Sequence, residues 1–397
     1  MIAESMVKLL NFTCRFCLLA AIVLLVACRE NETDEEPFCE RTLFMYLPWS
    51  TNLTPYFYTN ISDMEKAVRE KGLDNERVVV FLSTTSSEAS MFEIVYENGE
   101  TRRNTLKTYD SPAFTTVGGL AAILNDVKSF APARSYAMTI GCHGMGWLPP
   151  VHGSRKSRSA ESFKPHWEYD NAWATRYFGG ASSAYQTDIS TLAESLERAG
   201  MPMEFILFDD CYMSSIEVAY TLRHVADYLI ACPTEIMAFG MPYAEIGKYL
   251  LGEPDYEAVC REFKKFYAAY RYPYATFGIT RCSELETLAS LMKEINGLFV
   301  FDETERAELQ PMDGYDPAIF YDYGDYVSHL CSDSVLLEQF NEQLGRAVPY
   351  KVHTEKYYSA AGGVKSIWTF SGITTSAPSI SPQAADWVDT DWYRATH

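Results

Sequence analysis

A histidine and a cysteine occupy matching positions in two separate parts of the chain, each just after a short apolar run. The run at residues 137–141 (AMTIG) leads into His143, and the run at residues 205–208 (FILF) leads into Cys211. Short continuous apolar runs fit buried parallel strands, and ligand-binding side chains in an open α/β sheet lie just past the carboxyl ends of such strands. We therefore expect His143 and Cys211 to lie at the same edge of one sheet.

These two residue types together suit nucleophilic attack on a carbonyl carbon. We expect Cys211 to open a helix, where unpaired N–H groups and the helix dipole stabilise a thiolate. The imidazole of His143 could take the thiol proton or pair with the thiolate. Gly144 lets the backbone approach a substrate carbonyl closely, so the N–H groups of Gly144 and Cys211 are candidates to bind the developing oxyanion.

Less specific interpretations of both residues stay open at this point. A single cysteine in an apolar context is usually a packing residue, and a single histidine is usually a hydrogen-bonded structural residue. Cys142 points to the opposite face of its strand from His143 if the strand is regular, so we interpret it as packing. Cys232 and Cys282 stand at predicted strand ends and are interpreted as core residues.

Apolar strands and amphipathic helices alternate from residue 41 onward. Buried strands are predicted at residues 42–47, 78–82, 137–141, 205–208 and 228–231. Helices are predicted at residues 61–71, 117–129, 189–199 and 213–225, and an edge hairpin at residues 91–96 and 101–109. Such alternation predicts an α/β fold with a mainly parallel sheet and helices on both faces. After Pro254 the alternation is looser, which predicts an extension packed on the first unit.

The first forty residues have the pattern of an export signal. Residues 16–27 (FCLLAAIVLLVA) carry no charge. They fit the apolar region of a signal peptide, because a bilayer-spanning helix needs roughly 20 apolar residues. The run ends in Leu25-Val26-Ala27-Cys28, which is similar to a bacterial lipobox, and the polar, acidic residues 29–37 fit a solvated tether. We predict a signal peptide at residues 1–27, a lipidated tether at 28–40, a core at 41–250 and an extension at 251–397.

Composition and missing motifs exclude several classes of protein. The formal net charge of −20 disfavours binding to nucleic acid, and no basic stripe or Gly-rich phosphate loop is present. A zinc hydrolase is disfavoured because His143 and His152 do not form an HExxH motif and the mature chain has no CxxC pair. No G-x-S-x-G elbow supports a serine hydrolase. We therefore predict no metal site and no cofactor.

Two blocks of sequence resemble the catalytic motifs of the clostripain (C11) family of cysteine peptidases. The block at residues 208–220 (FDDCYMSSIEVAY) is similar to the family pattern FDACLMASVEVAY. His143-Gly144-x-Gly146-Trp147 matches the family's HG-x-GW block, and the order of histidine before cysteine agrees. The resemblance extends from about residue 41 to about residue 250, and more weakly to about residue 370.

The resemblance implies a caspase-like three-layer αβα sandwich with a mainly parallel sheet, plus a C-terminal α/β extension. It implies a His143–Cys211 dyad that cleaves peptides after Arg or Lys, with Asp209 as one acid of the S1 pocket. Phe239 stands about where the family pattern has a second acid, so the P1 preference stays open. Some relatives need calcium, but no motif in this sequence supports a calcium site.

A short basic stretch separates the two catalytic candidates. Arg155, Lys156 and Arg158 lie in a segment whose composition fits an exposed loop. Because relatives are activated by cleavage between histidine and cysteine, the sharper hypothesis is that these three residues form a processing site.

Together these observations predict an exported cysteine endopeptidase. We expect a monomer that acts on peptide or protein substrates and is attached through a lipid on Cys28 to the bacterial envelope, at the outer membrane or cell surface. The alternative is a catalytically inactive, surface-binding lipoprotein with the same caspase-like fold.

Overall fold

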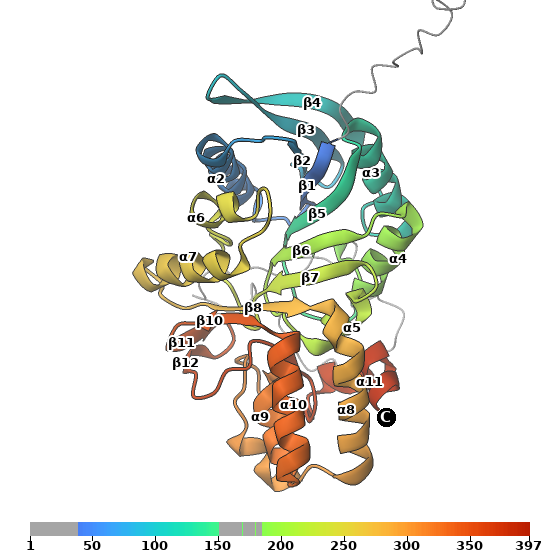
Figure 1. Ribbon diagram of the computed structural model, residues 1–397, viewed down its shortest axis with the longest axis vertical. Helices are drawn as coiled ribbons and strands as arrows, with labels where there is room; N and C mark the ends of the chain where they lie inside the picture. Colours follow the sequence, from blue (N-terminus) through green and yellow to red (C-terminus); the bar gives the residue numbers. More distant parts are fainter. Residues whose placement is uncertain (1–38, 151–168, 170–178, 180–184) are drawn as a thin grey trace, which may run out of the picture. The chain divides into compact units, whose positions relative to one another are not determined.

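A nine-stranded sheet organises the chain from Cys39 to His397, as Figure 1 shows. The computed structural model describes residues 39–150, 169, 179 and 185–397. The strand order is β10-β8-β7-β6-β5-β1-β2-β3-β4. Strands from early and late parts of the sequence therefore share one sheet.

The centre of this sheet is parallel. Every neighbouring pair in the series β2-β1-β5-β6-β7 is parallel. The five strands are β1 (Cys39–Leu47), β2 (Glu76–Ser83), β5 (Ala133–Gly141), β6 (Met203–Asp209) and β7 (Ala226–Ala231). Their side chains are buried over most of each strand, as expected for a sheet covered on both faces. Because parallel strands run the same way, their carboxyl ends all lie at one edge.

Antiparallel strands flank the parallel centre on both sides. On one side, β3 (Glu88–Glu97) and β4 (Glu100–Asp110) form the predicted hairpin. Its turn residues Asn98 and Gly99 have φ angles of 54° and 86°, and positive φ at both positions is typical of a type I′ turn. On the other side, β8 (Thr276–Arg281) and β10 (Tyr350–His353) complete the sheet.

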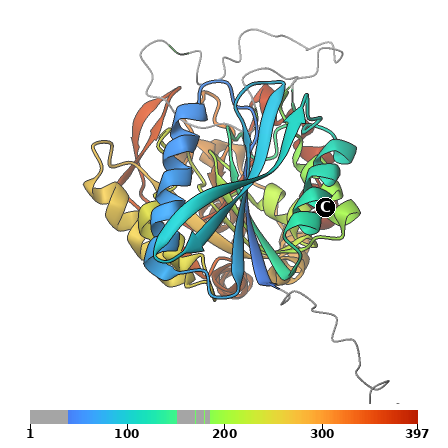
Figure 2. The same cartoon turned by 90° about the horizontal axis from the view of Figure 1, so that it is seen from above.

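Helices cover both faces of the sheet and make three layers (Figures 1 and 2). One face carries α2 (Thr54–Lys71), α6 (Tyr243–Ile246) and α7 (Tyr256–Ala269), and the other carries α3 (Val117–Phe130), α4 (Ile189–Ala199) and α5 (Ile216–Leu222). The predicted α/β architecture is confirmed.

Helix α4 shows how local sequence sets the bounds of these helices. The Asp188 side chain caps its first turn, and Gly200 ends it in a left-handed conformation.

The sequence after α7 adds further helices and two small sheets. Helices α8 (Leu285–Leu298), α9 (Tyr323–Leu330) and α10 (Ser334–Ala347) lie below β8 and β10 in Figure 1, with α11 (Asp391–Thr396) beside α8. The small sheets pair β11 (Lys356–Ser359) with β12 (Gly363–Ser366) and β9 (Tyr321–Asp322) with β13 (Thr374–Thr375). Within the described ranges, no helix combines the length and apolar character needed to cross a membrane.

Candidate active site

The carboxyl edge of the parallel strands carries both predicted catalytic residues. Four adjacent strands, in the order β7-β6-β5-β1, end in loops at this edge. His143 lies in the loop after β5 and Cys211 in the loop after β6. The loops after β1 and β7 flank them on either side. The structure therefore brings His143 and Cys211 to the edge that the sequence predicted.

The strand register places the two residues next to each other. Gly141 at the end of β5 pairs with Asp209 at the end of β6, so His143 and Cys211 each lie two residues beyond a paired position. Neighbouring strands are about 4.8 Å apart. The two loops therefore leave the sheet side by side.

Gly144 lies where these two loops touch. A Cβ atom at this position would be 2.3 Å from the carbonyl oxygen of Cys211 and 3.0 Å from its backbone nitrogen. Only glycine fits without movement of the backbone. The N–H groups of Gly144 and Cys211 thus belong to adjoining backbone segments, as an oxyanion-binding pair requires.

Cys211 is fully buried, and its sulfur contacts the loop after β7. The N–H of Ile236 donates to Sγ at 3.3 Å, and the thiol can donate to the Ile236 carbonyl oxygen at 3.8 Å. A hydrogen bond from an N–H group favours negative charge on its acceptor. The loop after β7 therefore supplies a donor to the sulfur in the position of the nucleophile.

The helix after Cys211 begins later than the sequence predicted. A helix was expected from residue 213 with Cys211 at its opening, but α5 begins at Ile216 and is capped by the Ser215 side chain. The predicted opening of a helix at Cys211 is therefore wrong, and with it the basis for stabilising a Cys211 thiolate by a helix N-terminus. The Ile236 N–H is the donor that the structure supplies in its place.

Backbone hydrogen bonds to residues distant in the sequence explain why α5 begins late. The N–H of Ser214 donates to the carbonyl oxygen of Cys232 at 3.1 Å, and the Ser214 carbonyl oxygen accepts from the N–H of Thr374 at 3.0 Å. Ser214 is thus paired on both sides, and Ser215, which follows it, is extended. Because the N–H and carbonyl groups of Ser214 are already used, the chain turns into the helix only after Ser214.

His143 is buried, and its ring is held by the loop after β1. Its Nε2 atom lies 2.8 Å from Oδ1 of Asn52. With the amide oxygen as acceptor, Nε2 carries the ring proton and Nδ1 carries the lone pair that a base needs. The backbone N–H of His143 donates to the carbonyl oxygen of Gly179 at 3.4 Å. A residue from the sequence between His143 and Cys211 therefore contacts the candidate base.

The two aspartates before Cys211 are fully buried and accept backbone hydrogen bonds. Oδ1 of Asp209 accepts from the N–H of Met241 at 2.7 Å, and Oδ1 of Asp210 accepts from the N–H of Cys142 at 2.6 Å. Asp210 thus ties the two catalytic loops together. Asp209 ties the loop of Cys211 to the loop after β7.

Phe239 belongs to a group of aromatic side chains near α7. Its ring stacks on Phe266 with the centroids 5.0 Å apart and lies 5.7 Å from the ring of Tyr270. Its backbone carbonyl oxygen accepts from the Asn60 side chain at 3.1 Å. The position that carries an acid in the related motif is therefore filled by a ring packed against α7.

The segment around β13 contacts both catalytic loops. The Trp147 indole N–H donates to Oγ of Ser376 at 2.8 Å, and the Ser376 N–H donates to Oε1 of Glu217 at 2.9 Å. Trp147 follows His143 in its motif, and Glu217 lies in α5 after Cys211. Burial raises the pKa of Glu217, although hydrogen bonds from Ser376 and neighbouring groups lower it. The C-terminal region therefore helps to shape the site.

Several predicted site residues fall outside the described residues. These are Cys28, the predicted lipidation site, and Arg155, Lys156 and Arg158, the predicted processing site. Within residues 39–150 and 185–397, no group of three or more His, Cys, Asp or Glu side chains could hold a metal ion.

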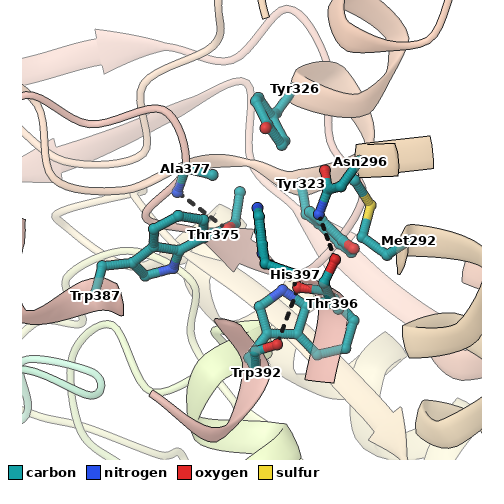
Figure 3. A pocket seen from close by; sticks show the side chains of 10 residues that line it. All are labelled: Met292, Asn296, Tyr323, Tyr326, Thr375, Ala377, Trp387, Trp392, Thr396 and His397. Carbon is teal, nitrogen blue, oxygen red and sulfur yellow. Dashed lines mark hydrogen bonds between the residues drawn. The ribbon is translucent and has the colours of Figure 1, made fainter. Parts of the chain in front are cut away.

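One small cavity lies away from the catalytic loops. It is surrounded by Trp387, Trp392 and His397 together with side chains from α8 and α9, as Figure 3 shows. Its volume is about 10 Å³, which is room for about one water molecule. It is too small to bind a peptide.

Four residues at the site were given no role by the sequence. Asn52, Glu235 and Ile236 lie in the loops after β1 and β7, and Tyr212 directly follows Cys211. The sequence offered one clue to two of them, since Asn52 and Glu235 follow strands that the sequence did predict. Their contacts depend on which strands are neighbours in the sheet.

Comparison with known proteins points to one family of peptidases. The model of the clostripain family matches residues 45–344. A secreted C11 cysteine protease of Bacteroides thetaiotaomicron, iotapain, is 52% identical with a TM-score of 0.84, covering 91% of this chain and 99% of that chain. No curated protein matches the chain.

Two further solved structures are similar. A clostripain from Bacteroides thetaiotaomicron ATCC 29148, in complex with the peptide inhibitor BTN-VLTK-AOMK, is 56% identical with a TM-score of 0.55, covering 56% of this chain and 99% of that chain. An inactive zymogen C11 protease from Parabacteroides distasonis is 26% identical with a TM-score of 0.75, covering 91% of this chain and 99% of that chain.

Proposed function

Because this chain belongs to the clostripain family of cysteine peptidases, we propose that it hydrolyses peptide bonds with Cys211 as nucleophile and His143 as base. One observation carries the proposal. His143 and Cys211 lie equally far beyond the paired residues Gly141 and Asp209, at the carboxyl ends of adjacent parallel strands. This arrangement places the two residues on adjoining loops, as a nucleophile and its base require.

In the proposed reaction, Nδ1 of His143 takes the thiol proton of Cys211, and the sulfur attacks the carbonyl carbon of the substrate. The N–H groups of Gly144 and Cys211 bind the oxyanion that forms. Collapse of this intermediate expels the amine, which takes the proton from His143 and leaves a thioester. Water then gives up a proton to His143 and hydrolyses the thioester, which releases the acid and restores the thiol. Asn52 holds Nε2 and so orients the ring.

We propose that the P1 residue is Lys or Arg. The Asp209 carboxylate beside the catalytic loops supports this proposal, as does the lysine that precedes AOMK in the inhibitor of the 56% identical relative. The packed ring of Phe239 weakens it, because two carboxylates hold a buried cation better than one. A positional-scanning peptide library should show the strongest cleavage after Lys and Arg. A preference for apolar P1 residues would mean that Phe239 has redefined the pocket.

We also propose that the enzyme cuts itself once within residues 155–159. Self-processing is supported by the burial of both residues in the intact chain, where His143 is 1% exposed, Cys211 is 0% exposed and Gly179 contacts His143. A cut between the two residues would give substrates access to them. Residues 155–159 belong to the same chain as the active site, so their effective concentration at the site is high. An S1 pocket with one carboxylate is therefore enough for slow cleavage there. Purified wild type should give two bands on a denaturing gel, and Cys211→Ala should give one.

The two fragments should stay associated under native conditions. The first contributes β1–β5 and the second β6, β7, β8 and β10 to one sheet. The triple substitution Arg155→Ala, Lys156→Ala, Arg158→Ala should remain one band. If the wild type also stays one band while it cleaves peptides efficiently, self-processing is not needed.

We propose that Cys28 is acylated and that residues 1–27 are removed. The support is the charge-free run that ends in the Leu-Val-Ala-Cys box, followed by an acidic tether. Mass spectrometry of the membrane fraction should find a mature N-terminus at Cys28 that carries acyl chains. A cellular protein that retains Met1, or begins beyond Cys28, would contradict the anchor.

A further inference from the structure

Tyr212, the residue after the proposed nucleophile, has an unusual backbone conformation. Its φ angle is 60°, and its side chain is fully buried. A bulky residue rarely adopts this left-handed conformation, and it persists only where surrounding contacts enforce it. The family pattern FDACLMASVEVAY has leucine at this position, so the tyrosine hydroxyl is a departure of this chain.

A buried glutamate holds the hydroxyl of Tyr212. The hydroxyl donates to Oε1 of Glu235 at 2.7 Å, and the ring stacks on Phe320 with the centroids 5.2 Å apart. Burial and the nearby Glu235 carboxylate raise the pKa of Tyr212 well above its ordinary value. The phenol therefore keeps its proton and acts as donor.

Glu235 is itself fixed by contacts from a different part of the chain. Oε1 also accepts from the hydroxyl of Ser359 at 2.7 Å and from the N–H of Ala360 at 3.0 Å. These residues belong to the end of β11 and the turn after it. Glu235 is 1% exposed, so the carboxylate is a buried anchor with three donors from two segments of the chain.

The same glutamate lies beside the second contact to the nucleophile. Ile236, the next residue, donates its N–H to Sγ of Cys211. Glu235 therefore adjoins both groups that hold Cys211: the left-handed residue after it and the N–H donor to its sulfur.

We propose that Tyr212 and Glu235 form a positioning pair for the nucleophile. The buried carboxylate fixes the hydroxyl of Tyr212, and this hydrogen bond keeps the backbone after Cys211 in the conformation that aims the sulfur and the Cys211 N–H at the substrate carbonyl. Neither residue touches the substrate. The inference rests on the proposed function, because it assigns a role only if Cys211 is the nucleophile.

Tyr212→Phe tests this pair because it keeps the ring and removes the hydroxyl. We expect kcat to fall about tenfold or more, since small misplacement of a reacting group is costly, while KM changes less than about twofold because no substrate contact is lost. Inactivation by a peptidyl acyloxymethylketone should slow in parallel with kcat. The matched control is Tyr109→Phe, which removes a tyrosine–carboxylate hydrogen bond to Asp126 beside the edge strand β4. It should leave kcat unchanged.

A double-mutant cycle makes the test specific to the pair. In a Glu235→Gln background, where the carboxylate is replaced by a weaker acceptor, Tyr212→Phe should cost much less kcat than it does in the wild type. Equal losses in both backgrounds would overturn the proposal, as would a folded Tyr212→Phe enzyme with wild-type kcat. A matching loss in Tyr109→Phe would also overturn it. Wild-type protein without Cys211-dependent turnover would overturn the proposed function first, and the pair with it.

Discussion

Cys211→Ala is expected to reduce kcat/KM at least about a thousandfold, because loss of a nucleophile typically costs several orders of magnitude in rate. The fold should persist, since the side chain loses a single sulfur atom. His143→Ala should have a nearly equal effect. Asn52→Ala should cost less, about tenfold, because it removes only the group that orients the His143 ring. Initial rates on a peptide substrate and thermal melting of each variant check these expectations.

Cys142→Ala is the matched control for the nucleophile. Cys142 is a buried cysteine in the loop adjoining that of Cys211, and its backbone N–H donates to Asp210. This hydrogen bond involves the backbone and survives the substitution. Cys142→Ala should therefore keep wild-type turnover. If Cys142→Ala were inactive and Cys211→Ala active, the nucleophile would be Cys142.

Gly144→Ala is expected to have the second large effect. Its Cβ would lie 2.3 Å from the Cys211 carbonyl oxygen and 2.8 Å from Cβ of Asp210. Real atoms cannot approach so closely, so the loop after β5 must move away from the loop after β6. This movement separates the N–H groups of Gly144 and Cys211. Loss of one oxyanion donor costs about a hundredfold to a thousandfold in kcat, and we expect a loss of that size.

Gly297→Ala provides the control for a glycine substitution. Gly297 lies in α8, and a Cβ there would meet nothing within 4 Å. Because Gly297 lies in the last turn of α8, alanine there should stabilise the protein by less than the about 0.5–1 kcal/mol typical of a helix interior and leave kcat unchanged. An active Gly144→Ala enzyme with a wild-type melting temperature would show that the two N–H groups do not act together.

The positions of His143 and Cys211 could be predicted because they depend on local patterns. Apolar runs mark the strands, and parallel strands present their carboxyl ends at one edge. The roles of Asn52 and Glu235 could not be predicted in this way. Each is a polar residue in a loop, and its contacts exist because β1 lies beside β5 and β7 lies beside β6. That order is a property of the whole sheet.

The start of α5 was mispredicted for a related reason. Residues 213–225 have helical composition, but Ser214 pairs with Thr374, which is 160 residues away. A pairing at this distance leaves no trace in the local sequence. The same pairing brings the C-terminal region against the nucleophile, so the extension after residue 250 takes part in shaping the site.

Covalent labelling tests the central assignment most directly. The wild-type enzyme should be incubated with a biotinylated peptidyl acyloxymethylketone that ends in lysine, digested, and analysed by tandem mass spectrometry. We predict a single thioether adduct on the peptide that contains Cys211, absent from Cys211→Ala and formed far more slowly in His143→Ala. An adduct on Cys142 or another thiol, or labelling that persists undiminished in Cys211→Ala, would contradict the assignment of Cys211 as the nucleophile.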